Sequence, residues 1–363
     1  MSFAGTADRS ALAIQRETER DGTSLTADAD RETVTYTAKF LADNLESAVN
    51  NLSDAVTGQL FHPWEVADAK THSAVAFSPE EAVLDALHSG AFRTTLGRSA
   101  ATPDHKVGNI TPAALEAFTA ANFTGGNISV VGSGVDHAAL VDLCEDTFGE
   151  VAAGDDVPAE AASYYGGFES RVDAAGDNVL FGIAYEGAAA GASNAAAVAV
   201  LSEVLGGEKA TKWGSSSNAN KLSAIAEAAG GSVNSFNKSY SDAGLVGVVV
   251  AAPSDSAGAA VHAVSSALAA VLGGDISPED VAKAKNKLAL SIYDSSAASA
   301  NALVANQLLS TKQPSTIDDL AAAVSAVTVA DVLDAAAAVG ASSPTVAAYG
   351  NVAFAPYADE IGL

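Results

Sequence analysis

The chain has 363 residues, enough for about two domains of the usual size. Hydrophobic residues make up 48% of it, which excludes a disordered protein and provides for sizeable cores. Its 44 Asp and Glu against 18 Lys and Arg give a formal net charge of −26, so nucleic acid and anionic lipid are disfavoured as direct partners. Such acidity is typical of a soluble part of a large assembly, and a halophilic origin would produce similar numbers.

The start of the chain lacks the features of a targeting segment. The first twenty residues have no apolar core of a secretory signal, and they contain the acids Asp8, Glu17 and Glu19, which a mitochondrial presequence avoids. If the protein is imported, we expect its targeting segment to be absent from this chain. No run of about 18 strongly apolar residues occurs, so we predict no membrane span.

The first half begins with a hairpin that helices follow. Residues 22–40 alternate apolar and polar residues around a polar turn, which predicts a β-hairpin. Leucine and valine recur with helical spacing over residues 41–52 and predict a helix directly after it. Ser78-Pro79 predicts the opening of a further helix. Residues 110–116 predict the start of a helix that leads to a strand at 127–132.

The second half repeats this order of elements. A strand at 178–185 precedes a hairpin at 231–250, and a helix at 254–272 follows the hairpin. Ser277-Pro278 opens another helix, and a strand at 345–350 closes the unit. The hairpin glycines are 209 positions apart (22 to 231) and the closing glycines 218 apart (132 to 350). This steady offset predicts two domains of related fold.

We therefore predict an α+β protein of two related domains, each a mostly antiparallel sheet packed with helices. The first domain spans residues 1–150, a linker rich in Gly, Ala and Asp spans 151–177, and the second domain spans 178–363. The first unit has only 21 residues before its hairpin. By comparison with the second unit, we expect about thirty residues, holding a strand and most of a helix, to be absent ahead of Met1.

Alanine supplies much of the apolar content. Ala188–Ala199 and Ala335–Val339 predict closely packed helices, because alanine is the strongest helix former and has a small side chain. Cys144 is the only cysteine and has helical spacing from Leu140 and Val141. We interpret it as a core residue rather than a nucleophile.

The histidines lack the spacing of a metal site. Two zinc-binding histidines on one helix stand four residues apart, which places both on one face. No two of the six histidines here are closer than ten residues. They are His62, His72, His88, His105, His137 and His262. We interpret each as a surface or hydrogen-bonded core residue and predict no catalytic, metal or cofactor-binding site.

Glycines and paired carboxylates do not predict a site either. Gly132-Ser-Gly134 lies between a strand and a helix, but the third glycine of a nucleotide loop is missing and Asp136 would repel phosphate. The Gly-x-Ser-x-Gly elbow of hydrolases is absent from the sequence. Asp155-Asp156 lies in the predicted linker, and Asp318-Asp319 in the first turn of a helix, where negative charge is favourable. We interpret both pairs as solvated surface.

The repeated order of elements resembles the M16 (pitrilysin) peptidase-like family, which includes the mitochondrial processing peptidase subunits and the core proteins of the cytochrome bc1 complex. The matching segments are residues 31–36, 64–68, 74–77, 83–88, 165–167, 212–215, 236–247 and 284–288. Phe236–Gly247 is the most specific of them and is similar to the bc1 core proteins. A processing peptidase α subunit would carry a long glycine-rich loop, for which Gly206-Gly207 is too short.

The resemblance also implies which residues an active member would need. Active members hold zinc with an inverted His-x-x-Glu-His motif and a distal glutamate in a Glu-x6-Glu spacing. The residue seven positions after Glu65 is His72, so the expected glutamate is missing from Trp64–Ala76. The chain is therefore expected to be an inactive peptidase homologue.

The resemblance implies a function in assembly. The chain would be a structural subunit of the respiratory chain, peripheral on the matrix side of the mitochondrial inner membrane. It would pair with a core protein 1 (processing peptidase β-like) subunit and contact cytochrome b and cytochrome c1 in the dimeric complex III, without binding haem, quinol or metal. Two alternatives stay open: a non-catalytic processing peptidase α subunit that binds basic presequences, and a zinc peptidase without its catalytic half.

Overall fold

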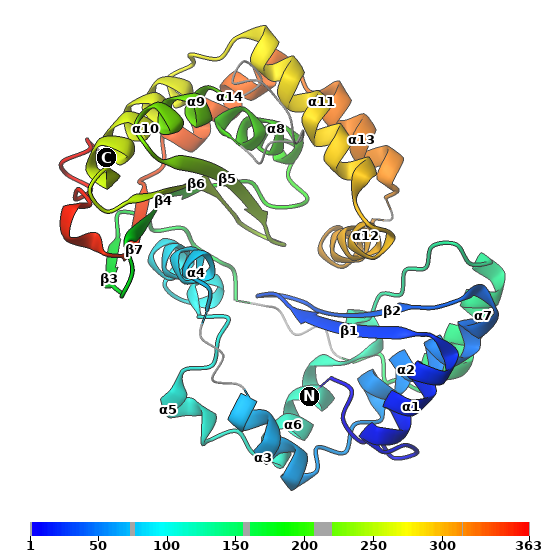
Figure 1. The fold of residues 1–363 in the computed structure, drawn as a ribbon. Coiled ribbons are helices and arrows are strands. Elements are labelled where there is room, and N and C mark those ends of the chain that lie inside the picture. Colours follow the sequence, from blue (N-terminus) through cyan, green and yellow to red (C-terminus); the bar gives the residue numbers. More distant parts are fainter. Residues whose placement is uncertain (1, 73–76, 155–159, 207–219, 314, 363) are drawn as a thin grey trace. The chain divides into compact units, whose positions relative to one another are not determined.

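The computed structural model describes residues 2–72, 77–154, 160–206, 220–313 and 315–362. The chain divides into two compact units, and neither is continuous in sequence (Figure 1). Unit 1 comprises Met1–Ala76, Ala100–Ala159 and Ser296–Pro314; unit 2 comprises Phe77–Ser99, Glu160–Ser295 and Ser315–Leu363. The domain limits predicted from the sequence follow chain order instead, and they stay a prediction.

Unit 1 is built from one hairpin and a set of helices. Its elements are α1 (Ala11–Asp21), β1 (Ser24–Ala29), β2 (Val34–Lys39), α2 (Leu45–Thr57), α3 (Pro63–His72), α5 (Asp104–Val107), α6 (Pro112–Asn122), α7 (His137–Phe148) and α12 (Ala297–Thr311), with short 3₁₀ turns at Ala42–Asn44 and Gly125–Asn127. β1 and β2 pair antiparallel from Ser24 with Lys39 to Ala29 with Val34. The first predicted hairpin is confirmed, and so is the helix after it.

The strand predicted at 127–132 is wrong. The structure has a 3₁₀ turn at Gly125–Asn127, and residues 128–132 after it pair with no described strand. A strand is stable only when neighbouring strands satisfy its backbone groups. The corresponding strand of unit 2 has a neighbour on each side, whereas β1 and β2 pair only with each other among the described strands of unit 1.

Unit 2 contains a five-stranded sheet in the order β3-β7-β4-β6-β5. Its elements are α4 (Pro79–Phe92), a 3₁₀ turn (Thr95–Gly97), β3 (Glu169–Asp173), β4 (Asn178–Glu186), α8 (Ala195–Leu205), α9 (Lys221–Ala228), β5 (Ser232–Ser239), β6 (Gly244–Pro253), α10 (Ala257–Leu272), α11 (Pro278–Asp294), α13 (Ile317–Ala326), α14 (Val329–Gly340), β7 (Thr345–Gly350) and a final 3₁₀ turn (Val352–Phe354). Among the described strands of this sheet, only β3 and β7 run parallel. The predicted fold class, a mostly antiparallel α+β arrangement, is confirmed, as are the second hairpin and the strands at 178–185 and 345–350. The second part of the predicted linker holds β3.

Helices cover both faces of this sheet (Figure 1). Phe181 and Ile183 of β4 point to the face that α8, α10 and α14 cover, and both are fully buried. Leu87 of α4 packs on the opposite face. A Cβ atom on Gly182 would lie 2.8 Å from the Leu87 Cδ1 atom and 2.7 Å from Val83 Cγ1. Glycine at this position therefore lets α4 approach the middle of β4.

The two alanine-rich segments behave differently. Ala335, Ala336 and Val339 are buried in α14, so the closely packed helix predicted there is confirmed. The helix predicted at Ala188–Ala199 begins only at Ala195. The Gly-Ala-rich residues before it make turns, and Ala190 N–H donates to the Tyr240 carbonyl at 2.8 Å rather than to a helical partner.

In the part of the chain that the structure describes, four helices open with a capping box, in which the side chains of the N-cap residue and the N3 residue bond to each other's backbone N–H. The pairs are Ser78 with Glu81, Ser277 with Asp280, Thr316 with Asp319 and Thr328 with Asp331. Both predicted Ser-Pro openings are confirmed. The two openings begin α4 and α11. These helices do not occupy equivalent places in the order of elements: α4 follows α3 and belongs to unit 2, whereas α11 precedes α12.

Across the described ranges, no single helix is long and apolar enough to cross a membrane. α13 and α14 reach that threshold only when taken together, and they are bent by 89° at their junction.

The capping boxes predict a loss of stability in acid. Hydrogen bonds from Thr328 hold the pKa of the Asp331 carboxyl below its usual value of 3.8. Because the folded-state pKa is depressed, the stabilisation is present above 3.8 and is lost as pH falls through the folded-state pKa. Asp331→Asn should lower the melting temperature at pH 7 but not well below pH 3.8. Asp334→Asn, an exposed change on the same helix, is the control; equal effects of the two variants at pH 7 would contradict the prediction.

Candidate functional site

The histidine side chains that the structure describes lie on different elements. His62 is half-buried at the start of α3 and stacks on Trp64, with ring centroids 4.4 Å apart. His105, His137 and His262 are exposed on α5, α7 and α10. His88 is buried in α4. The side chain of His72 lies outside the described residues. These positions agree with the surface and core roles that the sequence predicts.

Within the described ranges, no group of three or more His, Cys, Asp or Glu side chains could hold a metal ion. Glu65, the acid from which the Glu-x6-Glu spacing is counted, lies on α3, and its Oε1 atom accepts a hydrogen bond from Gly5 N–H at 2.9 Å. This carboxylate therefore fixes the N-terminal segment to α3. The absence of a catalytic or metal site stays a prediction.

His88 forms a buried polar pair with Tyr240. The His88 Nδ1 atom lies 2.6 Å from the Leu84 carbonyl oxygen, and the Nε2 atom lies 2.8 Å from the Tyr240 hydroxyl. A carbonyl oxygen only accepts, so in the neutral imidazole Nδ1 carries the proton and Nε2 accepts from Tyr240. The pair joins α4 to the β5–β6 hairpin inside unit 2. Its chemistry is structural, because each ring nitrogen has a protein partner.

Tyr240 of this pair lies in the Phe236–Gly247 segment, which carries the most specific family resemblance. Tyr240 N–H donates to the Ala243 carbonyl in the turn of the hairpin. Gly244 and Gly247 lie where a Cβ atom would come within 2.3 Å of the Ala188 oxygen and 2.1 Å of the Ile183 oxygen. The segment therefore has a packing role: two of its glycines allow close approach, and its tyrosine reaches α4.

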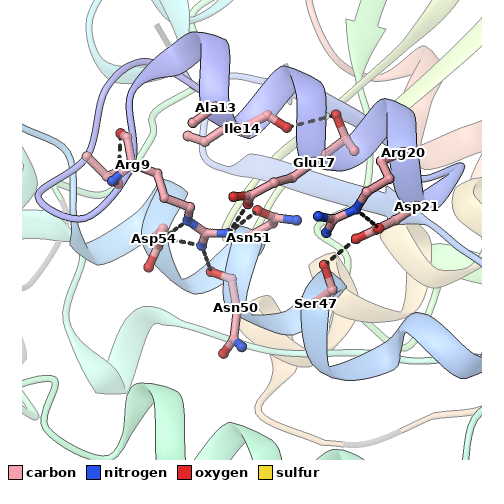
Figure 2. A network of polar contacts seen from close by, with 12 residues as sticks. Arg9, Ala13, Ile14, Glu17, Arg20, Asp21, Ser47, Asn50, Asn51 and Asp54 are labelled. Carbon is pink, nitrogen blue, oxygen red and sulfur yellow. Dashed lines mark hydrogen bonds and ion pairs between the residues drawn. The ribbon is translucent and has the colours of Figure 1, made fainter.

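Arg9 is the centre of a second polar cluster, in unit 1. Its Nε and Nη2 atoms donate to Asp54, and Nη1 donates to Glu17 at 3.1 Å and to Asn51 Oδ1 at 2.7 Å, as Figure 2 shows. Nη2 also donates to the Asn50 carbonyl at 3.2 Å. One guanidinium thereby joins the segment before α1, α1 itself and α2.

A smaller cluster repeats this connection at the other end of α1 (Figure 2). Arg20 donates to Asp21 at 2.9 Å, and the Ser47 hydroxyl of α2 donates to the same carboxylate at 3.0 Å. These hydrogen bonds hold the pKa of Asp21 below its usual value. Both clusters satisfy their charged groups internally and serve to position α1.

The other residues considered from the sequence as possible sites are a cysteine and two pairs of carboxylates. Cys144 is half-buried on α7 rather than fully in a core, and burial raises the pKa of its thiol, which disfavours the nucleophilic thiolate. Asp319 belongs to a capping box, and Asp318 accepts from the Tyr293 hydroxyl at 3.1 Å. Asp155-Asp156 and Lys212–Ser215 lie outside the described residues.

Both halves of the sequence match models of one peptidase family. Residues 1–104 match the model described as insulinase (peptidase family M16), and residues 109–288 match the M16 inactive domain. Cytochrome b-c1 complex subunit 2 of Homo sapiens is 31% identical over 97% of this chain and 79% of its own length. The chain belongs to the M16 peptidase family.

Two kinds of M16 relatives match this chain at different identities. Cytochrome b-c1 complex subunit 2 of Cryptococcus neoformans is 32% identical over 100% of this chain and 84% of its own length. The mitochondrial-processing peptidase subunit alpha-2 of Dictyostelium discoideum is 26% identical over 99% and 83%. The resemblance to bc1 core proteins, based on Phe236–Gly247, is confirmed.

Sequence reasoning missed the partners of three polar side chains. Tyr240 and His88 are 152 residues apart in the chain, and Arg9 and Asp54 are 45 apart. Arg171 of β3 reaches carbonyls more than 180 residues away. Periodicity reports only local neighbours, so none of these contacts has a local signal.

The His88–Tyr240 pair predicts a stability difference between two tyrosine variants. Tyr240→Phe removes the hydroxyl that bonds to the buried imidazole and should lower the free energy of unfolding by about 1–3 kcal/mol. Tyr293→Phe, which removes an exposed hydroxyl, should change it by less than about 0.5 kcal/mol. Chemical denaturation of both variants measures the difference. Equal losses of unfolding free energy in the two variants would show that the buried hydrogen bond stabilises the fold no more than the exposed one.

The Arg9 cluster predicts local loosening of α1. Arg9→Lys keeps the charge but loses the planar fork, so it should speed amide hydrogen exchange in α1 and cost about 1–3 kcal/mol of local stability. Arg16→Lys, at an exposed position of the same helix, should leave exchange unchanged. Unchanged exchange in the Arg9 variant would mean that apolar contacts alone hold α1.

Proposed function

We propose that this chain is a structural core subunit, core protein 2, of the mitochondrial cytochrome b-c1 complex (ubiquinol–cytochrome c oxidoreductase, complex III). The observation that carries the proposal is 31–32% identity to cytochrome b-c1 complex subunit 2 from human, rodents and fungi over 97–100% of this chain. The match covers both repeated units and not one shared domain.

We further propose that the chain itself catalyses no reaction. The match of residues 109–288 to the inactive domain supports this for the second half. For the first half, support comes from the missing glutamate: position 72, where the Glu-x6-Glu spacing requires an acid, holds histidine. A zinc peptidase without its catalytic half is therefore the least supported of the three hypotheses.

The proposed location is the mitochondrion, where the relatives are named as residing. More specifically, we propose a peripheral position on the matrix side of the inner membrane. The proposed partners are a core protein 1 or processing peptidase β-like subunit, cytochrome b and cytochrome c1, in a dimeric complex. The chain would contribute surfaces rather than cofactors to this assembly.

The processing peptidase α subunit is not favoured. Relatives of that name are 26% identical, below the values for subunit 2 of the b-c1 complex. The net charge of −26 would suit a basic presequence, but an acidic surface is not specific to that role.

Co-purification tests the proposal directly. The tagged chain, extracted from its own membranes with a mild detergent, should migrate on a native gel with cytochrome b and cytochrome c1 and contain less than one zinc per chain. Purification apart from both cytochromes would contradict the core-subunit role. Purification with a processing peptidase β subunit but without either cytochrome would instead support the processing peptidase role.

A further inference from the structure

β3 is an edge strand of the unit 2 sheet and pairs only with β7 (Figure 1). At one end of the ladder, Val346 N–H donates to the Phe168 carbonyl at 2.8 Å. At the other end, Ala174 N–H donates to the Gly350 carbonyl at 3.0 Å. Even-numbered residues of this segment therefore direct their backbone groups toward β7.

The odd-numbered residues face the other way. In a parallel ladder the N–H and C=O of one residue lie on the same side of the strand. The backbone groups of Glu169, Arg171 and Asp173 thus point to the free edge, and no described strand pairs with them. Such an edge is a template for an added strand, and β-strand addition is a common mode of peptide recognition.

Exposed apolar side chains flank this edge on both faces. Phe168 and Val172, on the face that α4 covers elsewhere, are 49% and 44% exposed. On the opposite face, Phe354 and Tyr357 are 68% and 53% exposed. A strand added beside β3 could therefore bury apolar side chains above and below it, in addition to its backbone hydrogen bonds.

Arg171 holds the second face in place. Its side chain donates to the carbonyls of Val352, Ala355 and Pro356 at 2.8–2.9 Å, and its guanidinium lies 4.1 Å from the centre of the Tyr357 ring. These contacts keep the C-terminal turn, with its exposed aromatics, next to the edge. The β3 edge and its apolar flanks are therefore already in position before a partner binds, which lowers the entropic cost of binding.

The charge around the edge selects the partner. Residues 169–177 and 351–363 contain five carboxylates and a single base, Arg171, whose guanidinium is already bonded. A second copy of this chain fits poorly, because antiparallel self-pairing centred on Arg171 would oppose Glu169 and Asp173. An extended segment with basic side chains fits well.

We propose that the β3 edge of unit 2 binds an extended segment of another polypeptide, with alternating apolar and basic side chains, as a sixth strand of the sheet. The proposal does not depend on the core-subunit role, because the edge, its apolar flanks and its charge are properties of unit 2 itself.

A short labelled peptide of alternating valine and lysine is the probe, added to the full chain at low salt. Fluorescence anisotropy should detect binding, and a peptide with every backbone nitrogen methylated should bind at least about fivefold more weakly, because it cannot donate to the edge. Equal binding of the two peptides would overturn the proposal, as would no binding of the unmethylated one.

Two protein variants test whether the peptide binds at the β3 edge. Val172→Lys places a like charge beside the basic peptide and should weaken binding at least about fivefold. Val34→Lys, at a valine of similar exposure in unit 1, should leave binding unchanged. If both variants bind as the parent chain does, the peptide occupies another surface and the proposal fails.

Amide hydrogen exchange gives the signature of strand addition. On peptide binding, the N–H groups of Glu169, Arg171 and Asp173 should gain protection, whereas Ser170 and Val172, which face β7, should change little. Uniform protection, or protection elsewhere, would indicate a merely electrostatic contact and overturn the proposal.

Discussion

Close backbone approach is the constraint on which unit 2 depends. Alanine buries little apolar area, so an alanine-rich core must gain its stability from many short contacts rather than a few large side chains. Gly182 provides one such contact by letting Val83 and Leu87 of α4 reach β4. On the other face, Ala335 and Ala336 let α14 lie close to its neighbours. A larger residue at Gly182 would push α4 away and expose both faces of the contact.

The same tight packing explains why polar side chains have structural roles. A buried imidazole needs partners for both nitrogens, and His88 finds them in the Leu84 carbonyl and the Tyr240 hydroxyl. Arg9 and Arg171 likewise direct their guanidinium donors to carboxylates and backbone carbonyls. Groups bonded in this way are poor candidates for acid–base or nucleophilic work, since that work requires a free and reachable atom.

Local pattern predicted those elements whose stability is local. Both hairpins have a polar turn between two strand segments, and both Ser-Pro helix openings lie within a few consecutive residues, so the sequence alone indicates them. The strand expected at 127–132 failed because a strand also needs neighbours, which its own residues do not encode. The helix expected from Ala188 begins seven residues later, because Gly187 and Gly191 favour turns over the helical propensity of the alanines between them. The Tyr240–His88 bond, between residues 152 apart, has no counterpart in any local pattern.

The Phe236–Gly247 segment shows what the family resemblance measures. Gly244 and Gly247 are required by approaching carbonyl oxygens, and Tyr240 by the imidazole of α4. Similarity in this segment therefore reports the packing of a hairpin against its sheet and one helix, not a catalytic group. A relative that keeps these residues keeps the scaffold whether or not it keeps a metal site. Surfaces are then the part of the molecule in which function can differ, and the free edge of β3 is a surface whose backbone, apolar flanks and charge all favour the same kind of partner.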